Sequence, residues 1–411
     1  MRLLLLTLNY APELTGIGKY SGEMAEWLAA RGHAVRVVTT PPYYPEWRVH
    51  DGYAAWRYAR ERRAGVDVVR CPLWVPRRQG GTARVLNLAS FAASSAPALV
   101  SAALRFRPEV IGVVKPPMFA LPTALLAARM TGARSWVHVQ DFEIDVAFDM
   151  GLLKGRAVGA AALRLEAGLL RRFDLATTVS ARMRERLVAK GVAEDRAALF
   201  PNWVDTRAIH PVAGAGPFRA ALGVAPDATV ALYAGNMGEK QGLDSLIDAA
   251  RVLSGDASIL LVLAGEGAAR RRLEAAAAGL ANVRFLRLQP VERLNDLLNL
   301  ADIHLLPQRA DAADLVMPSK LAGMLASGRP VIAGANPGTQ VAAEVEGAGL
   351  VVPPDDGAAL AAAVRRLAGD GAARALLGAE ARARAIAHWE RDAVLTRLEA
   401  SLVALIAPTP E

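Results

Sequence analysis

Two lysines of this chain stand in segments that are suited to hold a phosphate. Of the 48 Lys and Arg residues only six are Lys, and residues 206–411 contain 18 Arg but just two Lys, Lys240 and Lys320. Each lies in a loop that opens a predicted helix, where free backbone N–H groups favour an anion. A compact ammonium suits a point contact with phosphate, so the pattern favours phosphate binding over two chance surface lysines.

The segment around Lys240 follows a predicted strand and is rich in glycine. Gly235 and Asn236 end that strand in the run YAGNMGEKQG, which leads into the next helix. Glycine lets the backbone approach a ligand closely. Gly265 and Gly267 close the following strand, and their spacing fits either the same ligand or a plain strand-to-helix turn.

The segment around Lys320 reads VMPSKL. Pro318 suits the first position of a helix, because proline has no N–H to satisfy there. The N–H groups that follow it, in Ser319, Lys320 and Leu321, are then open to an anion. This segment is a second candidate site for an anionic group.

A third loop, NYAPELTGIGK at residues 9–19, carries Gly16 and Gly18 directly before a predicted helix. It matches neither GxGxxG nor GxxxxGK[ST], so the pattern is not specific by itself. An anion-binding loop and an ordinary turn that starts a helix both remain open.

A polar series follows another predicted strand in the first half. His138 and Gln140 share one face of that strand, and Asp141, Glu143 and Asp145 alternate after it. The three carboxylates fit either solvated loop positions or oxygen ligands for a divalent metal. The histidine fits either a hydrogen-bonded core position or a substrate contact.

Several site classes are excluded. One cysteine, Cys71, six histidines and no HExxH give no zinc site and no disulfide scaffold. No GxSxG elbow is present, and no GxGxxG follows either first strand, which disfavours dinucleotide chemistry. The single thiol fits a reducing compartment.

Short continuous apolar runs alternate with helical patterns in both halves, as expected for parallel strands covered on both faces. The predicted strands are residues 3–8, 35–39, 66–70, 110–114, 135–139 and 175–179, then 230–233, 259–263, 283–286, 303–306, 331–333 and 350–352. Helices are predicted over 243–253 and 270–278, and the tail 372–406 consists of helix formers. The pattern predicts two doubly wound α/β domains, whose ligands sit at the carboxyl ends of the strands.

The expected organisation has three parts. Residues 1–205 form a first Rossmann-like domain, and residues 206–385 form a second one. Residues 386–411 form a helix that we expect to pack back on the first domain. Prolines and glycines cluster at the join between the two domains, near residues 202–217.

The basic excess lies entirely in the first half. Residues 1–205 hold 28 basic and 18 acidic side chains, a net of +10, whereas residues 206–411 hold 20 and 22, a net of −2. The first half should therefore meet an anionic partner such as a membrane surface, a nucleic acid or a phosphorylated substrate. No nucleic-acid module is recognisable, so no nucleic-acid partner is expected.

Two segments bear on membrane association. The start MRLLLLTLNY lacks a small-residue cleavage site and is typical of a buried first strand rather than a secretory signal. Residues 85–104 carry no charge over 20 residues, but Asn87, Pro97 and four serines favour a buried or interfacial helix over a membrane span.

The motifs as a set resemble the retaining nucleotide-sugar glycosyltransferases of family 4, and most closely those of colanic acid and related exopolysaccharide biosynthesis. The likeness runs along nearly the whole chain. The stretches that carry it are residues 9–47, 138–143, 200–205, 233–243, 263–267 and 317–333. The resemblance implies the GT-B fold, in which two Rossmann-like domains face each other across a cleft.

The resemblance also assigns roles to residues near the donor. It implies that Gly16 and Gly18 lie near the donor phosphates, that Lys240 binds the diphosphate, and that residues 318–321 lie beneath the donor. Two departures concern the same site. Asn236 stands where the wider family has an arginine.

The second departure is the absence of the family's pair of glutamates, which fall near Leu315 and Gly323 here. Lys320 and Asp314 are expected to replace part of their work.

In the first half, Pro201 and Asn202 match the motif that leads into the second domain. The family's active-site histidine directly precedes an aspartate, but Gln140 precedes Asp141 here, and His138 stands two residues before Gln140. We therefore expect Gln140, Asp141 and His138 to share the catalytic region without a fixed role for the histidine.

The expected function is sugar transfer from a nucleotide diphosphate donor, GDP-fucose before GDP-mannose or a UDP-sugar, to a lipid-linked saccharide. The resemblance implies retention of the anomeric configuration without a metal or another cofactor. The enzyme is expected to be cytoplasmic and peripheral on the inner face of the cell membrane. A GT-B sugar-nucleotide epimerase and a non-catalytic nucleotide-sugar-binding assembly protein remain as alternatives.

Overall fold

The structure, a computed structural model, describes all of the chain except residues 78–79, 143–155, 215, 239–240, 311–317 and 408–411. The chain forms two compact units. Unit 1 comprises Met1–Asn202 with Val394–Glu411, and unit 2 comprises Trp203–Ala393. The C-terminal segment therefore belongs to unit 1, where Glu399 pairs with Arg31 and His33.

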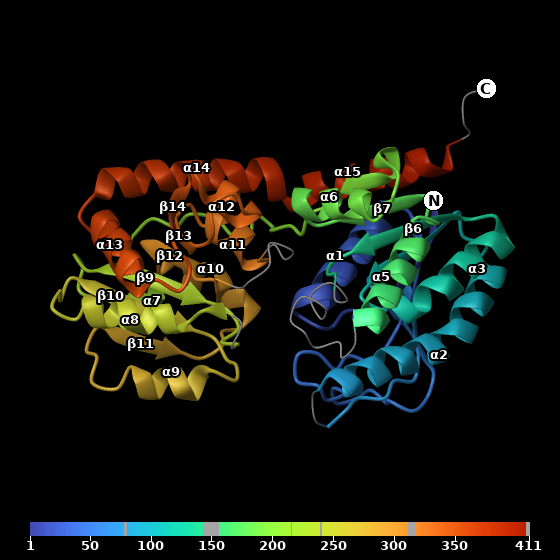
Figure 1. Cartoon of the computed structure of the whole chain (residues 1–411), viewed down its shortest axis with the longest axis horizontal. Coiled ribbons are helices and arrows are strands. Elements are labelled where there is room, and N and C mark those ends of the chain that lie inside the picture. The colour runs from blue at the N-terminus through green and yellow to red at the C-terminus, as the bar shows by residue number, and fades with distance from the viewer. Residues whose placement is uncertain (78–79, 143–155, 215, 239–240, 311–317, 408–411) are drawn as a thin grey trace. The chain divides into compact units, whose positions relative to one another are not determined.

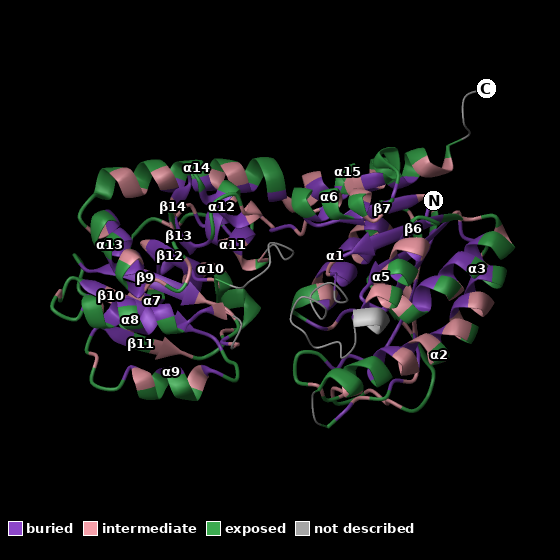
Figure 2. Cartoon of the chain, in the orientation of Figure 1, coloured by how far each residue is buried: buried purple, intermediate pink, exposed green. Residues whose placement is uncertain are grey.

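Unit 1 is built on an eight-stranded sheet in the order β3-β4-β2-β1-β5-β6-β7-β8. All neighbouring strands are parallel except β3, which pairs antiparallel with β4. The strands are β1 (Arg2–Thr7), β2 (Ala34–Thr39), β3 (Ala59–Arg63), β4 (Val66–Arg70), β5 (Val110–Lys115), β6 (Arg134–Val139), β7 (Leu175–Thr178) and β8 (Ala197–Leu199). The central strands are buried on both faces, which explains their unbroken apolar runs (Figure 2).

Helices cover both faces of this sheet. They are α1 (Gly16–Ala30), α2 (Gly81–Phe106), η1 (Met118–Ala120), α3 (Leu121–Thr131), α5 (Arg156–Leu170), α6 (Ala181–Ala189), η2 (Glu194–Arg196) and most of α15 (Arg391–Ile406). α2 and α3 lie side by side and pack on the central strands β1 and β5 (Figure 1). The core between them includes Leu4, Phe91, Val113 and Leu121.

Unit 2 has a six-stranded parallel sheet in the order β11-β10-β9-β12-β13-β14. Its strands are β9 (Thr229–Ala234), β10 (Ile259–Ala264), β11 (Val283–Leu286), β12 (Ile303–Leu306), β13 (Val331–Gly334) and β14 (Gly349–Val352). Its helices are α7 (Pro217–Ala221), α8 (Asp244–Val252), α9 (Arg270–Ala276), η4 (Val291–Arg293), α10 (Leu294–Asn299), α11 (Lys320–Ala326), α12 (Gln340–Val345), α13 (Gly357–Ala368) and α14 (Gly371–Trp389). This is the doubly wound order, which reverses between β9 and β12 and places a ligand crevice at their carboxyl ends.

All twelve predicted strands are present, with ends within one residue of the prediction. The two edge strands of unit 1, β3 and β8, were not predicted: β3 has the sequence ARERR without an apolar run, and β8 has only three residues. As its helix-forming residues indicate, the segment 372–406 is helical over most of its length. It is interrupted at Glu390, where Val204 N–H donates to Trp389 O and Arg391 N–H donates to Val204 O.

The predicted apolar helix over 85–104 is α2, which extends to 81–106. Among the described residues it is one helix whose length and composition would allow it to cross a membrane, and a third of its most apolar stretch is buried. It contacts α3, β1 and β2 as a core helix of unit 1 does.

Candidate functional site

The carboxyl end of β9, where the strand order of unit 2 reverses, holds three residues that the structure brings together. Gly235 follows β9 with φ of +154°, a backbone conformation suited to glycine. The Lys320 side chain lies against it, because a Cβ atom at Gly235 would stand 3.3 Å from Lys320 Cδ. The Lys320 ammonium also lies 4.2 Å from the centroid of the Tyr233 ring.

Among the described residues, the Lys320 ammonium has a polar and an aromatic contact but no carboxylate beside it. Its Nζ donates to Gln241 Oε1 at 3.2 Å, and in the described part of the chain no carboxylate pairs with it. Burial of the ammonium lowers the pKa of Lys320 from 10.5 to about 7. An anionic ligand at this place would supply the missing charge, so the geometry is that of an anion site.

The beginning of α11 presents Lys320 but not all of its neighbours. Leu321 N–H donates to Pro318 O at 3.0 Å, which closes the first turn. The Leu321 side chain is fully buried in the core, whereas Ser319 is exposed. The Lys320 side chain, the exposed Ser319 and the backbone of this segment can therefore face a ligand, whereas the Leu321 side chain cannot. Lys240 and Asp314, the other charged residues predicted here, lie outside the described residues.

Gly265 and Gly267 support the loop that follows β9. A Cβ atom at Gly265 would lie 1.9 Å from Gly235 O, and one at Gly267 would lie 2.4 Å from Met237 O and 2.7 Å from Asn236 Oδ1. Met237 N–H donates to Glu266 O at 2.8 Å. The two glycines are thus required for close packing of one loop on the other, and the Asn236 side chain lies against Gly267.

In unit 1, the loop after β1 is held by a buried carboxylate. Glu13 Oε1 accepts hydrogen bonds from the backbone N–H groups of Tyr43 and Tyr44, at 2.9 and 3.0 Å. Desolvation raises the pKa of Glu13. A Cβ atom at Gly18 would lie 2.5 Å from Glu13 Oε2, so this glycine makes room for the carboxylate. Gly16 begins α1 with φ of +56°, which favours glycine there.

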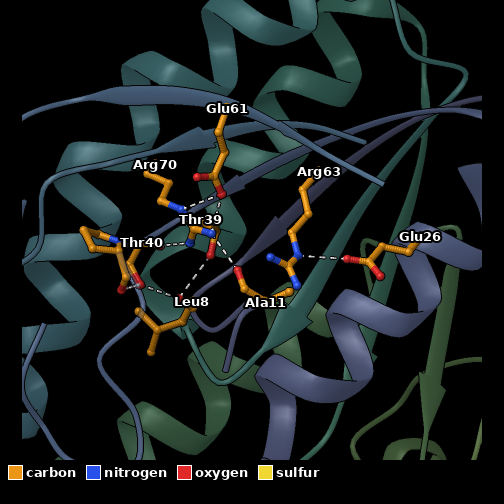
Figure 3. Close-up of polar contacts among 9 residues, drawn as sticks. Leu8, Ala11, Glu26, Thr39, Thr40, Glu61, Arg63 and Arg70 are labelled. Carbon is orange, nitrogen blue, oxygen red and sulfur yellow. Dashed lines mark hydrogen bonds and ion pairs between the residues drawn. The ribbon is translucent and has the colours of Figure 1, made fainter. Parts of the chain in front are cut away.

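Arg70, at the carboxyl end of β4, ties the neighbouring loops together (Figure 3). Its guanidinium donates to Thr40 O at 2.7 Å, to Ala11 O at 2.6 Å and to Glu61 Oε1 at 2.6 Å. The side chain is almost completely buried. The planar guanidinium of Arg70 therefore holds the loops after β1 and β2 together by hydrogen bonds.

His138 lies inside unit 1 as a neutral side chain. The Gln140 amide donates to His138 Nε2 at 2.9 Å and to Asn202 Oδ1 at 3.0 Å, and Asn202 Nδ2 donates back to Gln140 Oε1. His138 Nδ1 then carries the proton and donates to Thr177 Oγ1 at 3.0 Å. Burial lowers the pKa of His138 to about 3. Both ring nitrogens are thus engaged within unit 1, and the partly exposed Gln140 and Asn202 are the members that can face a ligand.

Asp141 is held by a buried charge cluster that we call the Glu166 cluster, made of Lys115, Glu166 and Lys190. Glu166 pairs with Lys115 at 2.7 Å and with Lys190 at 2.8 Å. Lys115 Nζ also donates to Asp141 O at 3.0 Å, and both ammonium groups lie within 5.5 Å of the centroid of the Phe142 ring. The cluster positions the chain just after β6.

The predicted carboxylate series continues into residues whose placement the structure does not describe. Glu143 and Asp145 are among them, so their geometry is not part of the site as seen here. Within the described ranges no group of three or more His, Cys, Asp or Glu side chains could hold a metal ion.

Comparison with known proteins agrees with this architecture. Residues 15–203 match the family model described as "Glycosyl transferase 4-like domain", and residues 228–370 match "Glycosyl transferases group 1". The chain is 42% identical, over 89% of its length and 92% of the relative, to the putative colanic acid biosynthesis glycosyl transferase WcaI of Escherichia coli K12.

Two solved structures show the same fold. Sucrose-phosphate synthase from Thermosynechococcus elongatus has a TM-score of 0.77 at 20% identity, covering 99% of this chain and 100% of that one. Anabaena HepE, in complex with UDP-glucose, has a TM-score of 0.68 at 16% identity, covering 98% and 100%. With two Rossmann-like sheets and a relative matched over most of its length, the chain belongs to the glycosyltransferases of the GT-B fold.

Proposed function

We propose that this glycosyltransferase moves a sugar from a nucleotide diphosphate sugar to a lipid-linked saccharide during the assembly of a colanic acid-type exopolysaccharide. The observation that carries the proposal is Lys320, a cation without a carboxylate partner among the described residues, beside Gly235 at the carboxyl end of β9. The relationship to WcaI supports the pathway, and the HepE complexes with UDP and UDP-glucose support the donor class.

The chemistry needs stabilisation of the leaving diphosphate more than a strong nucleophile. As the bond from the sugar to the phosphate breaks, negative charge grows on the diphosphate. Lys320 and Lys240 are proposed to stabilise that charge, together with backbone N–H groups at the beginnings of helices. Front-face attack by the acceptor within an ion-pair-like complex would retain the anomeric configuration, and no metal step is required.

The donor-binding part of the proposal assigns unit 2 to the nucleotide sugar and unit 1 to the acceptor. Gly235, Asn236 and the residues 318–321 would border the diphosphate. Gln140, fixed by Asn202, and the backbone at Asp141 would border the acceptor side. GDP-fucose is the first donor to test, followed by GDP-mannose and UDP-sugars.

We further propose that the enzyme acts in the cytoplasm, bound to the inner face of the cell membrane through unit 1. The support is the net charge of +10 in residues 1–205 and exposed apolar side chains in the same unit. These include Trp56, exposed to 79%, with Trp74, Val85 and Leu86. Basic residues beside exposed aromatic residues bind anionic lipid surfaces in a salt-dependent way.

Two experiments test these statements. A donor panel read by thermal shift and then by turnover should show one preferred nucleotide sugar, consumed only when a lipid-linked acceptor is present. Donor conversion without acceptor would indicate an epimerase, and donor binding without any turnover would indicate an assembly protein. For location, co-sedimentation should favour anionic over neutral vesicles and weaken with salt; equal, salt-independent binding to both would reject the membrane proposal.

A further inference from the structure

A groove of about 1130 Å³ lies on unit 1 between the edge strand β3 with its neighbour β4 and the C-terminal half of α2. It is larger than the roughly 300–1,000 Å³ usual for small-molecule pockets. Its lining includes Tyr58, Arg60, Arg62, Val69, Ala98 and Arg105. None of them belongs to the candidate site at the ends of β1, β6 or β9.

The groove follows from how the edge of the sheet is built. In the antiparallel register of β3 and β4, Arg60 stands opposite Val69 and Arg62 opposite Asp67, so these residues share one face. Arg63, on the other face, pairs with Glu26 of α1 (Figure 3). Arg60 and Arg62 are therefore on the face opposite α1, and they border the groove with α2.

The charges around the groove are unbalanced. Arg36 pairs with Asp67 at 3.3 Å, and Glu61 is held by Arg70. The exposed guanidinium groups of Arg60, Arg62 and Arg105 have no ion-pair partner in the ranges that the structure describes. Three cations thus border one groove, and its two carboxylates are already neutralised.

The groove also offers an apolar surface between these cations. Val69, Pro97, Ala98 and Ala102 line it, and the apolar part of the lining exceeds the polar part. At one end Tyr58 donates its hydroxyl to Ser94 O of α2 at 2.7 Å. Two residues before Tyr58 in the chain stands Trp56, whose side chain is exposed.

We propose that this groove binds one anionic lipid, with a hydrocarbon chain along Val69, Ala98 and Ala102 and the phosphate on the rim arginines. Free phosphate or nucleic acid would contact the arginines but would gain nothing from the apolar lining, whose burial against a hydrocarbon chain favours the lipid. The proposal rests on the proposed membrane association and gives it a discrete site, in contrast to a diffuse basic surface.

The test is calorimetric titration of the full chain with dihexanoyl phosphatidic acid below its micelle concentration. Inorganic phosphate and the zwitterionic dihexanoyl phosphatidylcholine are the comparison ligands. We expect saturable binding of one phosphatidic acid, at least tenfold tighter than either comparison ligand. Binding of inorganic phosphate with equal affinity, or no saturable binding of the lipid, would overturn the proposal.

Variants locate the binding. Ser101→Trp fills the groove from α2, and the double variant Arg60→Gln/Arg62→Gln removes two rim charges; each should weaken lipid binding at least tenfold. Ala93→Trp, exposed on the same helix outside the groove, and Arg129→Gln, exposed on α3, are matched controls that should stay within twofold. Melting curves check folding, and the arginine variant, at exposed positions, keeps the test valid if Ser101→Trp does not fold.

The calorimetric titration contains no sugar donor, so its result can be separated from a test of the proposed glycosyl transfer. Normal glycosyl transfer by a protein without lipid binding would overturn only the groove. Lipid binding by a protein without transfer would overturn only the transferase reaction.

Discussion

The ammonium of Lys320 lies 4.2 Å from the centroid of the Tyr233 ring, and within the described residues no carboxylate is paired with it. The aromatic face compensates only part of the desolvation of a cation. The pKa of Lys320 is consequently lowered to about 7, whereas burial raises the pKa of the Tyr233 phenol and keeps it protonated. The lysine is the titrating member of this pair.

Donor affinity should depend on pH through Lys320. The lysine is charged below pH 7 and loses its proton above it in the free protein, whereas a bound diphosphate favours the charged form. Affinity should therefore be full below pH 7 and fall by up to about tenfold per pH unit above it. Titration of a nucleotide sugar between pH 6 and 9 measures this dependence. Lys320→Arg, which stays charged, should be nearly flat over the range; an equal slope in both proteins would contradict the assignment.

Gly18→Ala should destabilise the protein although alanine is the better helix former. The added Cβ would stand 2.5 Å from Glu13 Oε2 and 2.6 Å from Glu13 Cβ. Overpacking of this kind costs about 1–3 kcal/mol, more than the roughly 1 kcal/mol gained in helix propensity. Gly81→Ala, at the beginning of α2 with nothing within 4 Å, is the control and should be neutral or stabilising. Equal melting temperatures for the two variants would show that Gly18 has no packing role.

Glu166→Gln should strongly destabilise unit 1. The substitution leaves Lys115 and Lys190 as buried cations without their shared carboxylate. Removing one partner of a buried ion pair typically costs about 3–5 kcal/mol. Urea unfolding provides the measurement, and Glu185→Gln, whose carboxylate pairs with Arg182 at the surface, should change stability by less than about 1 kcal/mol. Similar losses of unfolding free energy in Glu166→Gln and Glu185→Gln would mean that the Glu166 cluster does not hold the loop after β6.

The sequence pointed to the strands and to Lys320, but it did not reveal the buried side chains that hold the loops in place. The strands were predictable because a parallel strand buried on both faces is a local apolar run. The rarity of lysine in its half singled out Lys320 as a candidate, and its contact with a ligand stays a prediction. Arg70 and the Glu166 cluster were not predicted. They join residues from separate strands and helices, and a buried charge carries no local sign of its distant partners.

Gly18 shows the same limit in one residue. The spacing of Gly16 and Gly18 indicated either a ligand loop or a helix start, and the sequence could not decide between them. The deciding contact is with Glu13, whose carboxylate is placed by the backbone of Tyr43 and Tyr44 after β2. Only the folded sheet brings those two loops together.

The proposed mechanism predicts a product with the same anomeric configuration as the donor, and turnover that persists in excess chelator. Proton NMR of the product gives the configuration. The alternating series Asp141, Glu143 and Asp145 is the alternative source of metal ligands in the sequence. An inverted product, or activity lost with EDTA and restored by manganese, would reject this mechanism.

If Lys320 and Lys240 stabilise the diphosphate as it leaves, their alanine variants should show it in steady-state kinetics. Loss of one donor to a developing anion typically costs about 2.7–4 kcal/mol in the transition state. Each variant should therefore lose roughly 100- to 1,000-fold in kcat/KM, more than in donor affinity, and the arginine variants should recover only part of it.

Arg271→Ala, an exposed position of unit 2, serves as the control, with melting temperatures to confirm folding. The value of kcat/KM should stay near that of the wild type for Arg271→Ala and should fall roughly 100- to 1,000-fold for Lys320→Ala. If Lys320→Ala and Lys240→Ala both fold and turn over within about threefold of the wild type, less than about 1 kcal/mol, the diphosphate is not bound where this account puts it.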